Sequence, residues 1–199
     1  MSYRGPKAKK SRRLGVAVTP KSQRYLETRP TAPGQHGNRR RQKTSDYGRQ
    51  LLEKQKLRYQ YNVSEKQLRR AYAKASASHG STPDVLIQVL ESRLDSIVLR
   101  AGFARSIFAA RQYVGHGHFL VNGKKVDIPS YQVKVGDEIE VCLKSKECDM
   151  FKHSLGLATQ PAYVTVTDRD LKARYTYQPE REEIPVICDV PTVVEFYSR

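Results

Sequence analysis

Arginine and lysine dominate the first eighty residues of the chain, and their cationic groups are suited to binding phosphate. Residues 1–82 hold 21 Lys and Arg against 4 Asp and Glu, a net charge of +17. Residues 83–199 hold 15 against 16, so the first two-fifths of the chain carry all of its excess positive charge. Charge concentrated in this way is typical of proteins that bind nucleic acid. The candidates for phosphate contacts here are Arg12, Arg13, Arg49, Lys54, Lys56, Arg58, Arg69 and Arg70.

A second cluster of candidate side chains lies between residues 106 and 125. Two histidines in the motif His-Gly-His could serve a metal ion or a general base, but a third ligand and a nucleophile at useful spacing are lacking. A neutral imidazole that hydrogen-bonds to RNA, or that caps a helix end, is favoured instead. The candidates for RNA contacts in this cluster are Arg111, His116, His118, Asn122, Lys124 and Lys125.

Other kinds of chemistry find little support in the residue types. The three cysteines, Cys142, Cys148 and Cys188, form no Cys-x-x-Cys pair, which argues against a secreted disulfide framework and a four-cysteine zinc site. No glycine-rich phosphate loop or pair of catalytic carboxylates is evident. No apolar run approaches the roughly 20 residues of a membrane-spanning helix. We therefore expect no cofactor, no metal, no membrane partner and a reducing compartment.

The second cluster is predicted to sit on one compact unit of a helix and a small antiparallel sheet. Ser106 can cap a helix whose apolar residues recur at helical spacing up to Val114. The dipeptide Asn122-Gly123 predicts a tight hairpin with both residues at positive φ. The strands expected around it are 118–121, 124–128 and 138–141.

The first cluster is predicted to lie on a basic arm and on helices. Residues 1–44 show no sustained period and are expected to be irregular, with a turn at 32–37. Ser45 is a suitable cap for the first helix, and Ser64 with Gln67 forms a capping box for the second. An apolar pattern of period 3.6 then continues from Pro83 to Ala101. The expected helices are 46–61, 64–79 and 82–101, and the expected C-terminal strands are 163–167, 174–178 and 193–197.

These elements predict an α+β fold. A mostly helical, basic N-terminal domain would carry an inserted RNA-binding module, and the C-terminal strands would return to the first domain. The expected parts are an arm at 1–44, a helical RNA-binding domain at 45–90, the module at 91–142 and a C-terminal segment at 143–199.

Several motifs resemble the S-four family of small-subunit ribosomal proteins from bacteria and organelles. The resemblance covers nearly the whole chain in order, and its most specific part is APGQHG followed by SDYG. The module at 91–142 resembles the alpha-L RNA-binding module, which other RNA-binding proteins share. The matching stretches are APGQHG at 32–37, SDYGRQLLEKQKLR at 45–58, LESRLD at 90–95, ARQYVGHGH at 110–118, VNGKKVDIPSYQV at 121–133 and VEFYSR at 194–199.

This resemblance implies a primary rRNA-binding protein that nucleates assembly on the 5′ domain of small-subunit rRNA. It also implies contacts with ribosomal proteins S-five and S-three, an influence on translational accuracy, and a place at the channel through which mRNA enters. The basic stretch between APGQHG and SDYG assigns that last role to Arg39, Arg40, Arg41 and Lys43. The implied location is the ribosome, in the cytoplasm or in an organelle.

The chain departs from the family pattern in two ways. Many members bind zinc through four cysteines in the N-terminal arm, whereas this chain has Ala8 and Ser11 at the first two of those positions and no cysteine before Cys142. Relatives often carry basic residues where this chain has Ile107, Phe108 and Gly115. More of the binding is therefore expected from the N-terminal domain.

Some alternatives remain open at this stage. Arg93 and Asp95 are either a structural ion pair or an RNA-facing arginine with its neighbour. Three tyrosines either stack on unpaired bases or, as the favoured interpretation, pack in the core: Tyr59, Tyr61 and Tyr72. The rival function is a free-standing RNA-binding or RNA-modifying factor, although the chain outside 91–142 lacks a recognisable catalytic constellation.

Overall fold

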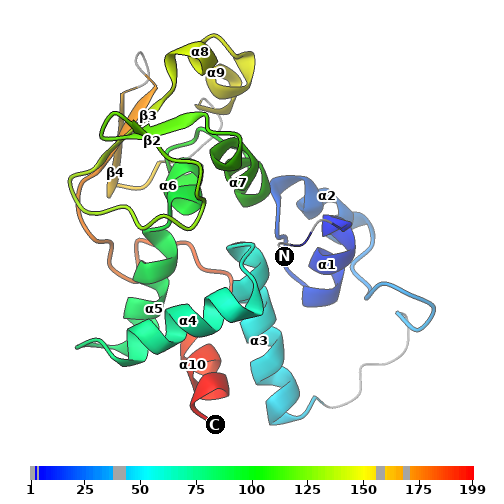
Figure 1. Ribbon diagram of the computed structural model, residues 1–199. Coiled ribbons are helices and arrows are strands. Elements are labelled where there is room, and N and C mark those ends of the chain that lie inside the picture. Colours follow the sequence, from blue (N-terminus) through cyan, green and yellow to red (C-terminus); the bar gives the residue numbers. More distant parts are fainter. Residues whose placement is uncertain (1–2, 4, 38–43, 156–159, 168–170) are drawn as a thin grey trace. The chain divides into compact units, whose positions relative to one another are not determined.

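The computed structural model describes residues 3, 5–37, 44–155, 160–167 and 171–199, and it divides into two compact units (Figure 1). Unit 1 consists of Met1–Pro83 and Val186–Arg199, and unit 2 of Asp84–Pro185. In the sequence, unit 1 holds 22 Lys and Arg against 6 Asp and Glu, whereas unit 2 holds 14 of each. The entire net charge of +16 therefore belongs to unit 1.

Unit 1 is helical, and its longest helix, α3, runs from Asp46 to Gln60. The Ser45 hydroxyl accepts from the Gly48 N–H and so caps α3, and Ser64 and Gln67 form the expected capping box of α4. The C-terminal helix α10 packs along α3. The helices of unit 1 are α1 (Lys7–Leu14), α2 (Pro20–Thr28), α3, α4 (Glu65–Ser76) and α10 (Val190–Ser198).

The expectation of an irregular arm at 1–44 is wrong for residues 7–14 and 20–28, which form α1 and α2. Pro6 and Pro20 stand at helix starts, and Gly15 ends α1 with a φ of 72°. Proline fits the first turn of a helix because the N–H that it lacks has no partner there, and glycine adopts positive φ without steric cost. The prolines and the glycine of the arm therefore mark helix ends.

The expected strand at 193–197 is also wrong, because this segment lies within α10. Val190 and Val193 are three residues apart, on one helical face, and both are fully buried. Contact with α3 therefore decides the conformation of a segment whose β-branched residues favour a strand.

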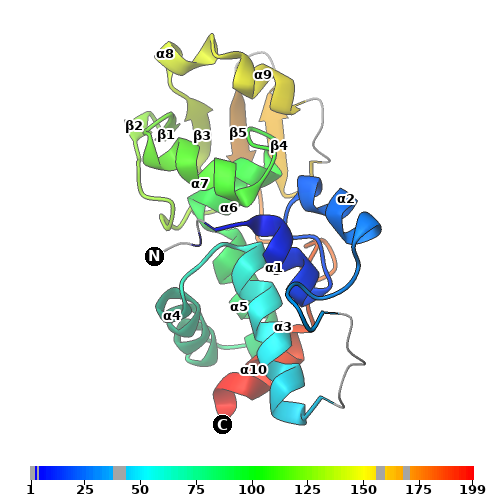
Figure 2. The same cartoon turned by 90° about the vertical axis from the view of Figure 1, so that its right-hand side faces the viewer.

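Unit 2 contains a five-stranded antiparallel sheet with the strand order β2-β1-β3-β5-β4 (Figure 2). β3 is central, pairing Ile139 with Val121 on one side and with Ala173 on the other. Phe103, Phe119 and Phe151 pack together in the core. The strands are β1 (Phe119–Val121), β2 (Lys124–Lys125), β3 (Glu138–Val141), β4 (Val164–Thr167) and β5 (Lys172–Tyr175). The helices are α5 (Thr82–Glu91), α6 (Leu94–Arg100), α7 (Ile107–Gly115), α8 (Leu143–Lys146) and α9 (Asp149–Leu155).

The single helix expected over 82–101 is broken into α5 and α6. Arg93 is extended, with a φ of −69° and a ψ of 143°. The loop at 129–133 pairs with the chain at this point: the Leu94 N–H donates to the Tyr131 carbonyl at 2.8 Å, and the Val133 N–H donates to the Ser92 carbonyl at 2.7 Å. Hydrogen bonds from a distant segment thus replace the helical hydrogen bonds at this point. The periodicity of apolar residues cannot reveal such a break.

The Arg93 side chain belongs to the interior of unit 2. It is 4% exposed and donates two hydrogen bonds to the fully buried Asp95 carboxylate, at 2.9 and 2.6 Å. Two parallel bonds of this kind fix both side chains in one geometry. Of the two alternatives for Arg93 and Asp95, the structure shows the structural ion pair.

Candidate nucleic-acid interface

One face of α4 carries exposed positive charge. Leu68, Ala71 and Ala75 are buried, and the opposite face consists of exposed basic side chains. Arg69 and Arg70 were expected from the sequence. Lys66 and Lys74 were not among the candidates from the sequence. They lie four residues before and after Arg70, a spacing that places all three side chains on the same helical face. The exposed basic residues of α4 are Lys66, Arg69, Arg70 and Lys74.

Two other expected arginines of unit 1 are also accessible. Arg13 is exposed on α1. Arg49, on the first turn of α3, has a side chain that is 65% exposed, and its guanidinium lies 3.8 Å from the carboxylate of the still more exposed Asp46. A surface pair of this kind contributes little free energy, so Arg49 can exchange Asp46 for a phosphate.

Lys54, by contrast, points into the protein. Its side chain is 7% exposed, and its Nζ lies 3.0 Å from Glu65 Oε1 and 4.5 Å from the centre of the Phe196 ring. Tyr197 donates a hydrogen bond to the same carboxylate oxygen at 2.7 Å. Lys54 therefore links α3 to α4 and α10.

The contacts of Lys54 and Tyr197 with Glu65 favour the ionised form of the Glu65 carboxylate. Burial raises the pKa of Glu65, but the hydrogen bond from Tyr197 and the hydrogen bond and charge of Lys54 outweigh it, so the pKa lies below its ordinary value. Burial and the Glu65 carboxylate raise the pKa of Tyr197, so its hydroxyl remains a donor. The stability of this cluster depends on a charged Glu65.

Two more expected phosphate contacts already have partners within unit 1. Lys56 Nζ lies 2.6 Å from Glu53 Oε1, and both side chains are largely buried. The Arg58 guanidinium donates to the Val63 carbonyl at 3.3 Å and lies over the Tyr59 ring. Binding of phosphate by either residue would compete with these contacts.

Arg12 holds the arm together. Its Nε donates to the carbonyls of Arg29 and Thr31, at 3.1 and 3.0 Å, just before the APGQHG turn. Within the turn, the Gly37 N–H donates to the Gly34 carbonyl at 3.1 Å, and a Cβ on Gly37 would lie 1.9 Å from the Ala32 carbonyl oxygen. The expected turn is confirmed, and it requires glycine at position 37. The basic stretch that follows, Arg39, Arg40, Arg41 and Lys43, lies outside the described residues.

Ser11, one of the positions that depart from the expected family pattern, has a structural role in the arm. It is fully buried, and its hydroxyl accepts a hydrogen bond from the Val18 N–H at 3.1 Å. Across the described ranges, no group of three or more His, Cys, Asp or Glu side chains could hold a metal ion. Hydrogen bonds of Ser11 and Arg12 therefore connect the segments of the arm.

The hairpin of unit 2 has the expected backbone, with φ values of 49° at Asn122 and 74° at Gly123. The Asn122 side chain is engaged within the unit: it donates to Asp137 Oδ1 at 2.8 Å and accepts from the Glu138 N–H at 2.9 Å. Lys124 and Lys125, on the returning strand, are exposed. The hairpin thus fixes two lysines whose ammonium groups can reach a phosphate.

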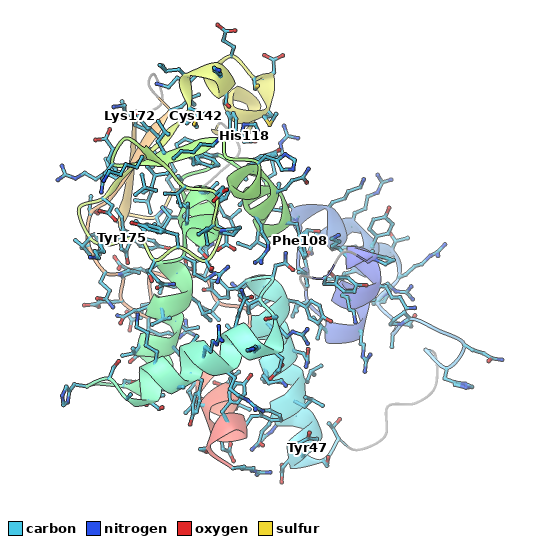
Figure 3. The ribbon with its side chains drawn as sticks, viewed as in Figure 1. Tyr47, Phe108, His118, Cys142, Lys172 and Tyr175 are labelled. Atoms are coloured by element: carbon cyan, nitrogen blue, oxygen red, sulfur yellow. The ribbon has the colours of Figure 1, made fainter. Side chains whose placement is uncertain are left out.

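The two histidines at the end of α7 differ in their surroundings. His116 is exposed, whereas His118 (labelled in Figure 3) is partly buried. The His118 ring lies against Tyr113 and Phe151, and its Nδ1 lies 2.8 Å from Ser145 Oγ. Burial, followed by the nearby charges of His116 and Lys125, lowers the pKa of His118. A neutral imidazole at pH 7 fits the expectation for His118.

Arg111, also on α7, is directed partly inward. Its side chain is 23% exposed, and Nη1 lies 3.5 Å from Asp95 Oδ2. It therefore shares the buried carboxylate with Arg93.

Comparison with known proteins identifies the family. Residues 2–91 match the family described as "Ribosomal protein S4/S9 N-terminal domain", and residues 92–139 match the "S4 domain". The "Small ribosomal subunit protein uS4" of Streptomyces avermitilis is 51% identical over 98% of this chain and 97% of its own. The chain belongs to the uS4 family. A protein of the same name from Chlorobium limicola is 48% identical over 99% of this chain and 98% of its own.

Membership of the uS4 family confirms the predicted resemblance and the presence of an RNA-binding S4 domain. The family consists of structural ribosomal proteins and not of enzymes. The two matched regions of this uS4 chain meet between residues 91 and 92, where α5 ends and the buried Arg93 begins the turn into α6. Among the described residues, no helix has the length and apolar character needed to cross a bilayer.

Proposed function

We propose that this chain is a structural constituent of the small ribosomal subunit that binds folded small-subunit rRNA and catalyses no reaction. The observation that carries the proposal is the charge of unit 1, whose net +16 is displayed in part by exposed side chains on α1, α3 and α4. The names of the relatives support the same assignment, since each is called a small ribosomal subunit protein.

The exposed arginines and lysines suit recognition of RNA shape. The major groove of A-form RNA is too narrow for side chains, so a helical protein reads phosphates and 2′-hydroxyls held in a fixed arrangement at a junction. Each phosphate that is neutralised releases condensed counterions, so affinity falls steeply as salt rises. Arg13, Arg49, Arg69 and Arg70 are the proposed phosphate contacts of unit 1, with Lys66 and Lys74 beside them on α4. The proposed phosphate contacts of unit 2 are Lys124, Lys125 and His116.

The finer role follows from the resemblance of the motifs. We infer that the chain binds early to the 5′ domain of the rRNA and nucleates assembly, and that it meets ribosomal proteins S-five and S-three. In that position it would influence translational accuracy and, through Arg39, Arg40, Arg41 and Lys43, the channel through which mRNA enters. The proposed location is the ribosome, and the relatives named above are bacterial.

Two experiments test the proposal. In a sucrose gradient at low salt, the endogenous protein is expected to sediment with small subunits, and a protein that stays in the soluble fraction would contradict a ribosomal role. In filter binding, the purified chain is expected to bind the 5′ domain of small-subunit rRNA more tightly than an unfolded RNA of equal length and charge. Equal affinity for the two RNAs would refute recognition of shape.

A further inference from the structure

A cavity of about 340 Å³ lies between α1 and α3 within unit 1, and of the phosphate contacts proposed above only Arg13 lines it. It falls at the lower end of the range of about 300–1,000 Å³ that is typical of small-molecule sites. It can therefore take a single planar ring system with its substituents but not a nucleic-acid duplex. Its lining residues are Lys10, Arg13, Leu14, Gly48, Leu51, Leu52, Gln55 and Tyr59.

The chemistry of the lining has three parts. Leu14, Leu51 and Leu52 supply an apolar surface, and Tyr59 supplies an aromatic ring. Lys10 and Arg13 supply positive charge, and no carboxylate lines the cavity. A ligand that suits all three parts has a flat apolar face and a negatively charged group.

The positive charge is held close to the aromatic ring. Lys10 Nζ lies 5.1 Å from the centre of the Tyr59 ring and 5.0 Å from that of Tyr3, and the two rings pack edge to face. These cation–π contacts position the ammonium group, and among the described residues no carboxylate forms an ion pair with it. Arg13 is exposed beside it.

We propose that this cavity binds one unpaired nucleotide of the rRNA, with the base against the three leucines and beside Tyr59, whose ring already carries Lys10 and Arg58, and with the phosphate on Lys10 and Arg13. The proposal rests on the rRNA binding proposed above and adds a defined site for one nucleotide. Unpaired bases in RNA junctions are commonly splayed out, so that a protein pocket can take up a single base. A nucleotide combines a flat base with a phosphate in one unit, whereas a peptide needs two separate side chains to supply a flat face and a negative charge, so the lining favours a nucleotide.

A fluorescent reporter tests occupancy directly. The chain has no tryptophan, so Leu52→Trp places the only one at the rim of the cavity, where Leu52 is 36% exposed. Tyr47→Trp is the control, because Tyr47 lies on the same helix, is 56% exposed and does not line the cavity (Figure 3). With each protein saturated by the 5′-domain rRNA, Leu52→Trp is expected to be quenched and shielded from acrylamide, and Tyr47→Trp much less so.

A second pair of substitutions tests the contribution to affinity. Tyr59→Leu removes the ring that lines the cavity and positions the Lys10 ammonium, so we expect about tenfold weaker rRNA binding. Tyr59→Phe keeps the ring and is expected to lose much less. Tyr47→Leu removes an exposed ring elsewhere on α3 and is expected to bind as the unsubstituted chain does. Thermal unfolding of each variant identifies any loss of affinity that comes from a loss of fold.

The outcomes separate this proposal from the proposed function. If the rRNA binds but the emission of Leu52→Trp changes no more than that of Tyr47→Trp, the nucleotide site is refuted and rRNA binding stands. Quenching that appears only when other ribosomal proteins are added would also refute it, because the occupant would then be a protein. If the unsubstituted chain does not bind the rRNA, the proposed function itself fails.

Discussion

Replacing Lys54 by methionine separates a structural lysine from one that binds phosphate. Methionine keeps the apolar stem of the side chain but removes the ammonium group, which lies 3.0 Å from Glu65 Oε1 and over the Phe196 ring. The matched control is Lys74→Met on α4, because Lys74 is exposed and its loss changes the net charge of unit 1 by the same amount. Any difference between the variants therefore reflects the position of the charge.

The expected cost of Lys54→Met follows from the burial of the pair. Removing one partner of a fully buried ion pair costs about 3–5 kcal/mol. Glu65 is 38% exposed, so water can partly compensate its carboxylate, and we expect a loss of about 2 kcal/mol. For a chain of this length, that corresponds to a decrease in Tm of about 4–8 °C. Lys74→Met is expected to stay within about 0.5 kcal/mol of the unsubstituted chain.

For rRNA binding, we expect Lys74→Met to have the larger effect and Lys54→Met the smaller one. If Lys74 contacts one phosphate, Lys74→Met reduces the magnitude of the slope of log K against log salt by about 0.7–0.9. Lys54→Met is expected to leave that slope unchanged. Thermal unfolding followed by circular dichroism and filter binding over a salt series supply the two measurements. A reduced slope with an unchanged Tm for Lys54→Met would refute the reasoning, because it would show an ammonium group that meets RNA.

Three further predictions concern local geometry and pH. Asn122→Ala removes two side-chain hydrogen bonds and places alanine at a φ of 49°. We therefore expect the free energy of unfolding of unit 2, measured in urea, to fall by about 2 kcal/mol. An unchanged free energy would contradict a role for this side chain. The pKa of His118 lies below its ordinary 6.5, so the folded state binds fewer protons than the unfolded state, and stability should fall as pH decreases from about 6.5 towards the folded pKa. His118→Asn should lessen this dependence of Tm on pH, and parallel curves would refute it. Gly37→Ala should displace the 32–37 turn and weaken rRNA binding, whereas exchange of the exposed His36 for alanine should leave the turn intact in amide NMR spectra.

The parts of the fold that depend on local hydrogen bonding were predictable from the sequence. Ser45, Ser64 and Ser106 each accept the backbone N–H that their position relative to the helix predicts. The positive φ values at Asn122 and Gly123 follow from the preference of this dipeptide for a tight hairpin. Such features are determined by a few neighbouring residues, so a sequence pattern is sufficient to reveal them.

Features that depend on distant segments were not predictable. The break at Arg93 is made by hydrogen bonds from residues 129–133, and the helical conformation of 190–198 depends on packing against α3. The charge of Lys54 was evident from the sequence, but its direction is set by Glu65 and by Phe196, which is 142 residues further along the chain. In α4, by contrast, Leu68 and Ala71 identify the buried face, so the exposure of Arg69 and Arg70 followed from spacing alone.

Ion pairing within unit 2 explains how an RNA-binding domain can carry no net charge. Its buried acids are paired with bases of the same unit: Glu91 lies 2.6 Å from Arg100, and Asp95 lies 2.6 Å from Arg93. Arginines that form these buried ion pairs stabilise the domain and are not available to bind RNA. Lys124 and Lys125, exposed at the hairpin, can therefore contact phosphate even though charge counting predicts none. The salt dependence of rRNA binding should follow the number of exposed cations and not the net charge of either unit, since only accessible groups displace counterions.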